Sequence, residues 1–113
     1  MSSSSCIFCK IISHQIPAKL IDETNNLIVI ADIAPKASIH YLIIPKKHVA
    51  DIQSLTGADA VLAGEMIMMA QKLSQQLMVP NAFKLVINSG AAAGQHVFHL
   101  HMHFLSGKVT DPV

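Results

Sequence analysis

Apolar residues in the first half of the chain cluster in short runs that end at turn-forming residues. Two such runs occupy residues 18–23 and 27–31, with the sequence Thr-Asn-Asn between them. Short runs bounded by turn residues are typical of strands, so these two predict strands joined by a turn. A third run at residues 39–44 ends at Pro45. Because proline cannot donate to a strand ladder, the third strand is expected to end there.

Residues 54–77 follow a different period. Apolar side chains recur every three to four positions, which predicts one long helix with Thr56 as its N-cap. The methionines of this region are expected to fill gaps in the core; they are Met66, Met68, Met69 and Met78. A shorter helix is expected at residues 8–12, before the turn at Ile16 and Pro17.

Histidine and large apolar residues alternate strictly from Phe98 to Phe104, after a further strand predicted at residues 83–88. Side chains on a strand alternate between its two faces. We therefore expect His99, His101 and His103 on one face and the apolar side chains on the other, against a core.

This spacing favours chemistry centred on one histidine. Neighbouring histidines would have Cα atoms about 6.5 Å apart and the outer pair about 13 Å apart, so one metal ion could hardly take all three. His101, the central histidine, is the candidate to act on a substrate while the other two orient it. A neutral imidazole is a nucleophile and can attack an anionic phosphate without charge repulsion. A pair of metal-binding histidines on a strand is the alternative.

Length and composition predict one globular domain over residues 1–113, with residues 1–5 disordered. The chain is 51% hydrophobic and only 13% charged, with a net charge of +1. That charge gives no field suited to nucleic acid or to an anionic membrane, so neither partner is expected. The sequence has no apolar run near the roughly 20 residues that span a bilayer and no signal-peptide pattern at its start. A cytoplasmic location is therefore expected.

Both cysteines lie in the sequence Cys6-Ile7-Phe8-Cys9. In a reducing cytosol, half of a metal site or a redox pair is more plausible than a structural disulfide, and a chance occurrence stays open. A thioredoxin-type redox motif would follow a strand, and nothing strand-like precedes Cys6. Zinc would need two more ligands, for which His48 and His99 are the candidates, giving a Cys₂His₂ set.

The loop at residues 89–95 is rich in glycine and alanine and leads toward His99. Small residues let a ligand approach the backbone, whose N–H groups can bind phosphate oxygens. An ordinary tight connection between strands is the alternative interpretation. Neither a P-loop nor a dinucleotide-binding motif is present in this loop.

The segment at residues 94–105, Gly-Gln-His-Val-Phe-His-Leu-His-Met-His-Phe-Leu, resembles the signature of the histidine triad (HIT) family, and specifically its nucleotide-binding, HINT-like branch. The resemblance extends along nearly the whole chain. Segments that match in the same order are residues 6–12, 16–19, 32–35, 40–48 and 86–90.

The resemblance implies a hydrolase that acts on purine nucleoside phosphoramidates or related nucleotide conjugates. His101 would attack the α-phosphorus and form a covalent nucleotidyl-histidine that water then hydrolyses. His103 would bind a phosphate oxygen and stabilise the transition state. His40 and His99 would support these two through hydrogen bonds, and Asp32 would accept the ribose hydroxyls. A nucleotide-binding interaction protein with only incidental turnover is the alternative.

Other positions match the nucleotide-binding residues of the family. Those that resemble the apolar wall around the base are Ile7, Phe8, Ile11, Ile30 and Ile33; those on the phosphate side are Asn88, Gly94, Gln95, His96 and Val97. His96 stands where the family usually has serine or threonine, and its imidazole could either donate a proton to the leaving group or simply crowd the site. Many bacterial members combine the two cysteines with a histidine at position 48 and the first triad histidine, as in the set Cys6, Cys9, His48 and His99. Because four protein ligands leave no open position, this zinc would be structural.

The predicted fold is α+β and HIT-like. We expect an antiparallel sheet of about five strands, with one long helix on one face and a short N-terminal helix. The resemblance also implies a homodimer that joins two sheets. A purine nucleotide is the expected ligand, and no organic cofactor is expected.

Overall fold

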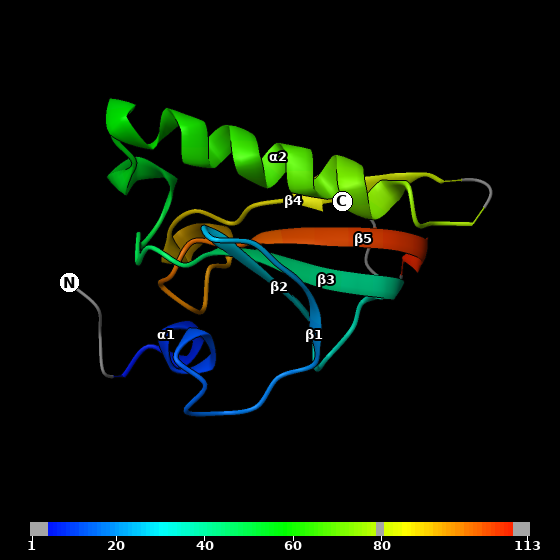
Figure 1. Cartoon of the computed structure of the whole chain (residues 1–113), viewed down its shortest axis with the longest axis horizontal. Coiled ribbons are helices and arrows are strands. Elements are labelled where there is room, and N and C mark those ends of the chain that lie inside the picture. The colour runs from blue at the N-terminus through cyan, green and yellow to red at the C-terminus, as the bar shows by residue number, and fades with distance from the viewer. Residues whose placement is uncertain (1–4, 79–80, 110–113) are drawn as a thin grey trace.

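The computed structural model describes residues 5–78 and 81–109 of the chain. A five-stranded antiparallel sheet has the order β1-β2-β3-β5-β4 (Figure 1). The strands are β1 (Leu20–Glu23), β2 (Leu27–Ala31), β3 (Ala37–Pro45), β4 (Phe83–Val86) and β5 (Met102–Val109), and the α-helices are α1 (Ile7–Ile12) and α2 (Ala60–Ser74). This confirms the predicted fold class. The expected disordered N-terminus lies mostly at residues 1–4, outside the described residues; Ser5 is exposed.

Helix α2 covers one face of the sheet and closes the larger core (Figure 1). Phe104 of β5 and Ile43 of β3 are fully buried beneath it, and Leu73 of the helix packs against the same cluster. Burial of a large apolar side chain contributes roughly 1.5 to 3 kcal/mol. This face therefore stabilises the fold.

The long helix begins later than the sequence predicts. Thr56 caps the 3₁₀ turn Gly57–Asp59 in a capping box with Asp59, and α2 follows from Ala60. The expectation that all four methionines fill the core is half right. Met66 and Met69 are buried, whereas Met68 and Met78 are 57% and 89% exposed.

The opposite face of the sheet is covered only in part, by helix α1. Phe8 of this helix packs with Ile28 and Ile30 of β2 and with Leu42 and Ile44 of β3. Toward β4 the same face carries histidines in place of apolar residues. The short helix thus leaves one end of this face available for a site.

The histidine segment is a strand only in its second half, which corrects the sequence prediction. Strand β5 begins at Met102, whose partner on β3 is Ile43. If the ladder continued toward the N-terminus, His101 would lie opposite Ile44 and Leu100 opposite Pro45. Proline has no N–H to donate to Leu100. The chain leaves the sheet there, and the Leu100 N–H donates to the carbonyl oxygen of Val49 at 2.6 Å. Phe98, expected in the core, is 47% exposed.

None of the described helices combines the length and the apolar character that crossing a bilayer requires.

Candidate active site and metal centre

His101 lies just before β5, almost fully buried against Phe8 of helix α1. The two ring centroids are 5.1 Å apart in an edge-on arrangement. The carbonyl oxygen of His99 lies 2.8 Å from Nδ1 of His101. Because a carbonyl can only accept, Nδ1 carries the proton and Nε2 keeps its lone pair. The backbone therefore holds the nucleophilic tautomer of His101.

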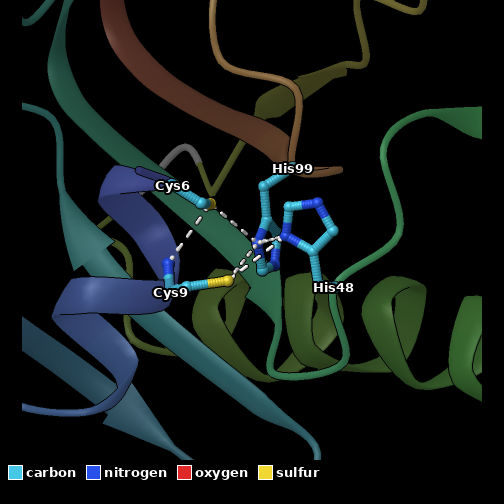
Figure 2. A group of neighbouring side chains, drawn as sticks. All are labelled: Cys6, Cys9, His48 and His99. Carbon is cyan, nitrogen blue, oxygen red and sulfur yellow. Dashed lines mark hydrogen bonds between the residues drawn. The ribbon is translucent and has the colours of Figure 1, made fainter. Parts of the chain in front are cut away.

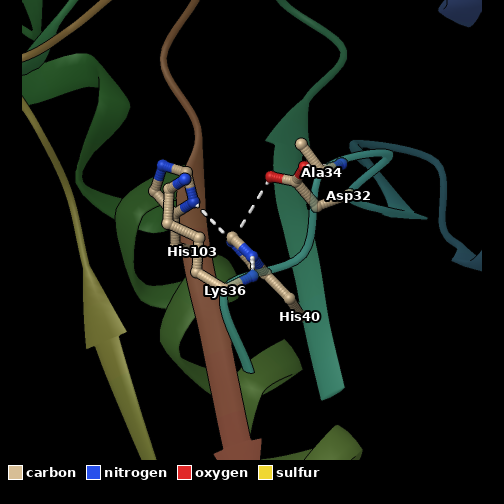
Figure 3. A network of polar contacts seen from close by, with 5 residues as sticks. All are labelled: Asp32, Ala34, Lys36, His40 and His103. Carbon is tan, nitrogen blue, oxygen red and sulfur yellow. Dashed lines mark hydrogen bonds and ion pairs between the residues drawn. The ribbon is translucent and has the colours of Figure 1, made fainter. Parts of the chain in front are cut away.

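His103 and His40 form a second chain of hydrogen bonds (Figure 3). The backbone N–H of Lys36 donates to Nδ1 of His40 at 3.0 Å, so the proton of neutral His40 is on Nε2. This Nε2–H donates to Nδ1 of His103 at 2.8 Å, and Oδ2 of Asp32 lies 3.4 Å from the same nitrogen. The proton of His103 is then on Nε2. The triad thus presents one acceptor, on His101, and one donor, on His103.

Burial keeps these imidazoles neutral. It is the main cause that lowers the pKa values of His40, His99 and His101 below the usual 6.5. For His103, burial and then the neighbouring histidines lower the pKa to about 4. At neutral pH all four side chains are therefore uncharged, as attack on an anionic phosphate requires.

A cavity of about 420 Å³ opens beside His103 and His40. Its lining is made by strands β3, β4 and β5 and by the loops after β2 and β4. The lining residues are Asp32, Ala34, Lys36, His40, Lys84, Val86, Asn88, His96, His103 and Leu105. The structure thus brings together Asp32, Asn88 and His96, which the sequence assigned to the ribose and phosphate sides.

Sequence reasoning missed the two lysines of this cavity, Lys36 and Lys84. Lys84 belongs to β4, which pairs with β5 across a long separation in the sequence. The alternation of Lys84 with Val86 places both on one face, but only the strand order brings that face beside His103.

The loop before the triad is held by Gln95. Its buried side chain accepts from the Gly90 N–H at 2.8 Å and donates to the carbonyl oxygens of Ala50 at 2.7 Å and Val97 at 3.0 Å. Gly94 has φ of +94°, a conformation that favours glycine. The Gln95 amide therefore holds the shape of the loop, because both of its N–H groups donate to backbone carbonyl oxygens.

The residues expected around the base are brought together in part. Ile11 and Ile30 line a second cavity of about 310 Å³ between α1 and the sheet. Phe8 is buried beside the triad histidines. Ile7 lines a different cavity together with Val97 and His96, and Ile33 is 98% exposed on its loop. Within the chain, Ile7 and Ile33 do not form one wall with the other three.

Cys6, Cys9, His48 and His99 converge at the N-terminal end of α1 (Figure 2). All four ligand atoms lie within 4.8 Å of one another. The Nε2–H of His99 donates to the carbonyl oxygen of Pro45 at 2.6 Å, which leaves Nδ1 unprotonated toward the sulfurs. The Nδ1 atoms of His48 and His99 are 3.1 Å apart.

These distances fit a tetrahedral ion. Zinc bonds of about 2.05 Å to nitrogen and 2.3 Å to sulfur would place N···N pairs about 3.3 Å apart and N···S pairs about 3.6 Å apart. The N···S distances are 3.4 Å for Cys6 to His99, 3.2 Å for Cys9 to His48 and 3.6 Å for Cys9 to His99. The residues present therefore fit zinc.

Comparisons with known proteins identify the family. Residues 5–113 match the family model described as scavenger mRNA decapping enzyme C-term binding. Over 102 residues the chain is 40% identical to an uncharacterised HIT-like protein from Synechocystis, with 90% of each chain covered. The chain belongs to the histidine triad family. The resemblance noted in the sequence is thereby confirmed at the level of the family.

Solved structures of HIT proteins have the same fold. A HIT family hydrolase from Legionella pneumophila Philadelphia 1 aligns with a TM-score of 0.88 at 39% identity, covering 92% of this chain and 94% of that one. A zinc-bound histidine triad family protein from Mycobacterium smegmatis aligns with a TM-score of 0.82 at 34% identity, covering 95% of this chain and 78% of that one.

Proposed function

We propose that this HIT protein hydrolyses purine nucleoside phosphoramidates and related nucleotide conjugates at the α-phosphate. The similarity to HIT family hydrolases supports a hydrolase of nucleotide-related substrates in general. The observation that carries the finer proposal is the pair of fixed tautomers. His101 offers an unprotonated Nε2 and His103 an Nε2–H; the His101 ring is buried, the His103 ring is partly buried, and both are neutral.

The reaction follows from these two nitrogens. Nε2 of His101 forms a bond to the α-phosphorus, and the bond from phosphorus to the amine nitrogen breaks. His103 donates to a phosphate oxygen as charge builds up on it. The amine leaves with the bonding electrons and takes up a proton. His96, which lines the cavity, is the proposed donor of this proton. Water then attacks the phosphorus and releases the nucleoside monophosphate and free His101.

The ribose and the base are assigned to the residues beyond His40. Asp32 accepts the Ala34 N–H at 2.8 Å, which orients its carboxylate and leaves acceptor capacity for two hydroxyls. The cavity that Ile11 and Ile30 line is apolar enough to take a flat base. Asn88, Gly94 and Val97 lie on the loop side, where the phosphate would sit.

Zinc in the Cys₂His₂ cluster is proposed to be structural. When bound, a zinc ion with four protein ligands would crosslink α1, the loop of His48 and the segment before β5. His99 supplies both a ligand nitrogen and the carbonyl that orients His101. Its side chain therefore supports the fold, while its backbone supports the nucleophile.

A homodimer is proposed through the outer edge of the sheet. Strand β4 is an edge strand; Phe83 at its start is 38% exposed, and Ile87, the residue after its end, is 37% exposed. Helix α2 also exposes Val61, Ile67 and Met68. An unpaired edge beside exposed apolar side chains is a surface that a second copy can cover. Light scattering on the purified protein would give twice the chain mass.

Trapping the intermediate tests the proposed reaction. Adenosine 5′-phosphoramidate, mixed with the protein and quenched during turnover, should leave an adenylyl group on His101, identified by peptide mass spectrometry. His101→Ala should bind adenosine monophosphate but form no adduct and release no amine. Nucleotide binding without release of amine by the wild type would favour the interaction protein instead.

A further inference from the structure

The cavity proposed to hold the base is apolar except at three of its lining residues. It has a volume of about 310 Å³ and lies where helix α1 leads into strand β1 (Figure 1). The polar lining residues are His14, Gln15 and Glu23. The faces of a flat base need apolar contact, whereas the polar groups at its edge need hydrogen-bond partners. These three residues are therefore the candidates to distinguish one base from another.

His14 adopts a backbone conformation that is rare for its residue type. It follows Ser13, the C-cap of α1, and has φ of +64°. Glycine is the usual residue at this position of a helix end, because a Cβ atom is strained there. Within the described residues, His14 is the only non-glycine residue with a positive φ. Backbone strain of this kind clusters at ligand sites, and the strained residue here lines a cavity.

Gln15 is already engaged at the helix end. Its side-chain N–H donates to Oγ of Ser13 at 2.9 Å, and this hydroxyl donates to the carbonyl oxygen of Lys10 at 3.2 Å. The backbone N–H of Gln15 donates to the same carbonyl oxygen at 2.8 Å. Gln15 therefore holds the last turn of α1, and with it the position of His14.

Glu23 brings a carboxylate to the cavity from the end of strand β1. Its Oε2 lies 2.6 Å from the ammonium nitrogen of Lys46. The hydrogen bond from Lys46 is the main cause that lowers the pKa of the Glu23 carboxyl, and His14 acts in the same direction. The carboxyl is therefore ionised at neutral pH, and His14 is close enough to interact with it electrostatically. Because a carboxylate has two oxygens, Glu23 can still accept from a ligand.

Strand register places Glu23 at the far end of the proposed nucleoside position. Glu23 is opposite Ile28 of β2, and Ile30 lies two residues closer to Asp32, the proposed ribose ligand. Four residues of extended chain from Ile28 to Asp32 span roughly 13 Å. A nucleoside can bridge this span with help from the two carboxylate side chains. With the ribose at Asp32, the edge of the base therefore faces Glu23.

A guanine base matches an imidazole beside a carboxylate. Its edge carries the acceptor O6 next to two donors, the N1–H and the 2-amino group. A carboxylate can accept from both donors in parallel, as it does from arginine, and an imidazole N–H can donate to O6. In the same orientation adenine presents the lone pair of its N1 to the carboxylate, which repels it. The arrangement therefore favours guanine.

We infer that His14 and Glu23 bind the edge of the base and select guanine over adenine in the nucleotide part of the substrate. This inference rests on the proposed function, since it names the base at the site assigned there. The strained backbone of His14 then has a role, because it holds the imidazole in the cavity lining near the Glu23 carboxylate.

Binding of the product nucleotides measures this selection without turnover. In the wild type, calorimetry should give guanosine monophosphate about a fivefold higher affinity than adenosine monophosphate, the effect of one partly exposed hydrogen-bonded contact. Glu23→Gln should bring the two affinities close together by weakening guanosine monophosphate alone. Asp22→Asn is the matched control and should keep the wild-type ratio. Asp22 is the neighbouring residue of β1, but its carboxylate pairs with Lys72 of helix α2 at 2.9 Å, on the other face of the sheet.

His14→Gly separates binding from folding. Glycine adopts φ of +64° without strain, so the unfolding free energy should change little, because the relief of strain offsets the greater freedom of the unfolded chain. The affinity for guanosine monophosphate should fall about fivefold, toward that for adenosine monophosphate. Ribose 5-phosphate, which lacks a base, should bind as it does to the wild type. An equal loss for ribose 5-phosphate would show that His14 acts on the fold of the site, and would overturn its role in base selection.

Turnover distinguishes this inference from the proposed function. The kcat/KM for guanosine 5′-phosphoramidate should exceed that for adenosine 5′-phosphoramidate by the same factor as the affinities. Equal affinities and equal rates in the wild type would overturn the base selection and leave the hydrolase standing. A guanine preference that survives both Glu23→Gln and His14→Gly would also overturn it, whereas no hydrolysis of either conjugate would count against the proposed function itself.

Discussion

The two faces of strands β3 and β5 have different roles, although each residue on one face is next in sequence to a residue on the other. Ile43 and Phe104 point toward helix α2 and are completely buried. On the opposite face, His40 and His103 are hydrogen-bonded to each other beside an open cavity. A long helix closes the first face, whereas the short helix α1 covers only part of the second.

The two faces differ in what their buried side chains require. Under α2, apolar side chains need only fill space. On the histidine face every buried polar atom needs a partner, because an unpaired one costs about 1 to 3 kcal/mol. Within the described part of the chain, no buried side-chain nitrogen or oxygen lacks a hydrogen-bond partner. Those same partners fix the tautomers, so satisfying the buried histidines also prepares them for chemistry.

The largest expected effect is on turnover at His101. His101→Ala or His101→Asn should lower kcat by several orders of magnitude, on the order of 10³ or more, because the attacking nitrogen is removed. His99→Ala and His103→Ala should cost less, since they remove support or one hydrogen bond. Single-turnover kinetics on the three purified variants would rank them. Equal losses at all three positions would contradict the assignment of His101.

On the histidine face, the Cys₂His₂ cluster is expected to contribute to the stability of the fold. If zinc is bound, the purified protein should carry about one ion per chain, and Cys9→Ser should lose it together with several kcal/mol of unfolding free energy. Elemental analysis and chemical denaturation measure the two quantities. Adding zinc back to chelated wild type is the control. A metal-free wild type whose melting temperature does not change on chelation would exclude the site.

On the face under α2, Phe104→Ala should cost about 3 to 5 kcal/mol of unfolding free energy, because a large buried ring leaves a cavity. The fraction that stays folded should keep its turnover within a few-fold of the wild type. Phe98→Ala is the matched control, since Phe98 is 47% exposed and its loss should change the unfolding free energy little. Equal costs at the two positions would mean that the core is not where the structure places it.

The sequence predicts the closed face better than the open one. The run at 27–31 matches β2 at both ends, because a short apolar run bounded by turn residues is a local signal. The histidine strand was predicted too long, since its first half depends on Pro45 of the partner strand, which alternation does not reveal. The triad and the Cys₂His₂ set came from local spacing and from family resemblance. Lys84 could not be placed beside the triad, because its position depends on the strand order.

The smallest expected effect is on acid stability, through His103. Its pKa is lowered to about 4 in the folded protein, mainly by burial, from a usual value of 6.5. Between these values the unfolded chain binds more protons than the folded one, so the unfolding free energy falls as the pH falls through this window. His103→Asn keeps an acceptor for His40 but does not titrate. Between pH 7 and pH 4.5 the wild type should therefore lose more unfolding free energy than this variant, by on the order of 1 to 2 kcal/mol. Denaturant titrations at both pH values measure the difference, and protonation of the metal ligands affects the two proteins alike. Parallel acid profiles would show that His103 is not held neutral by its surroundings, and the contrast between the two faces would then rest on geometry alone.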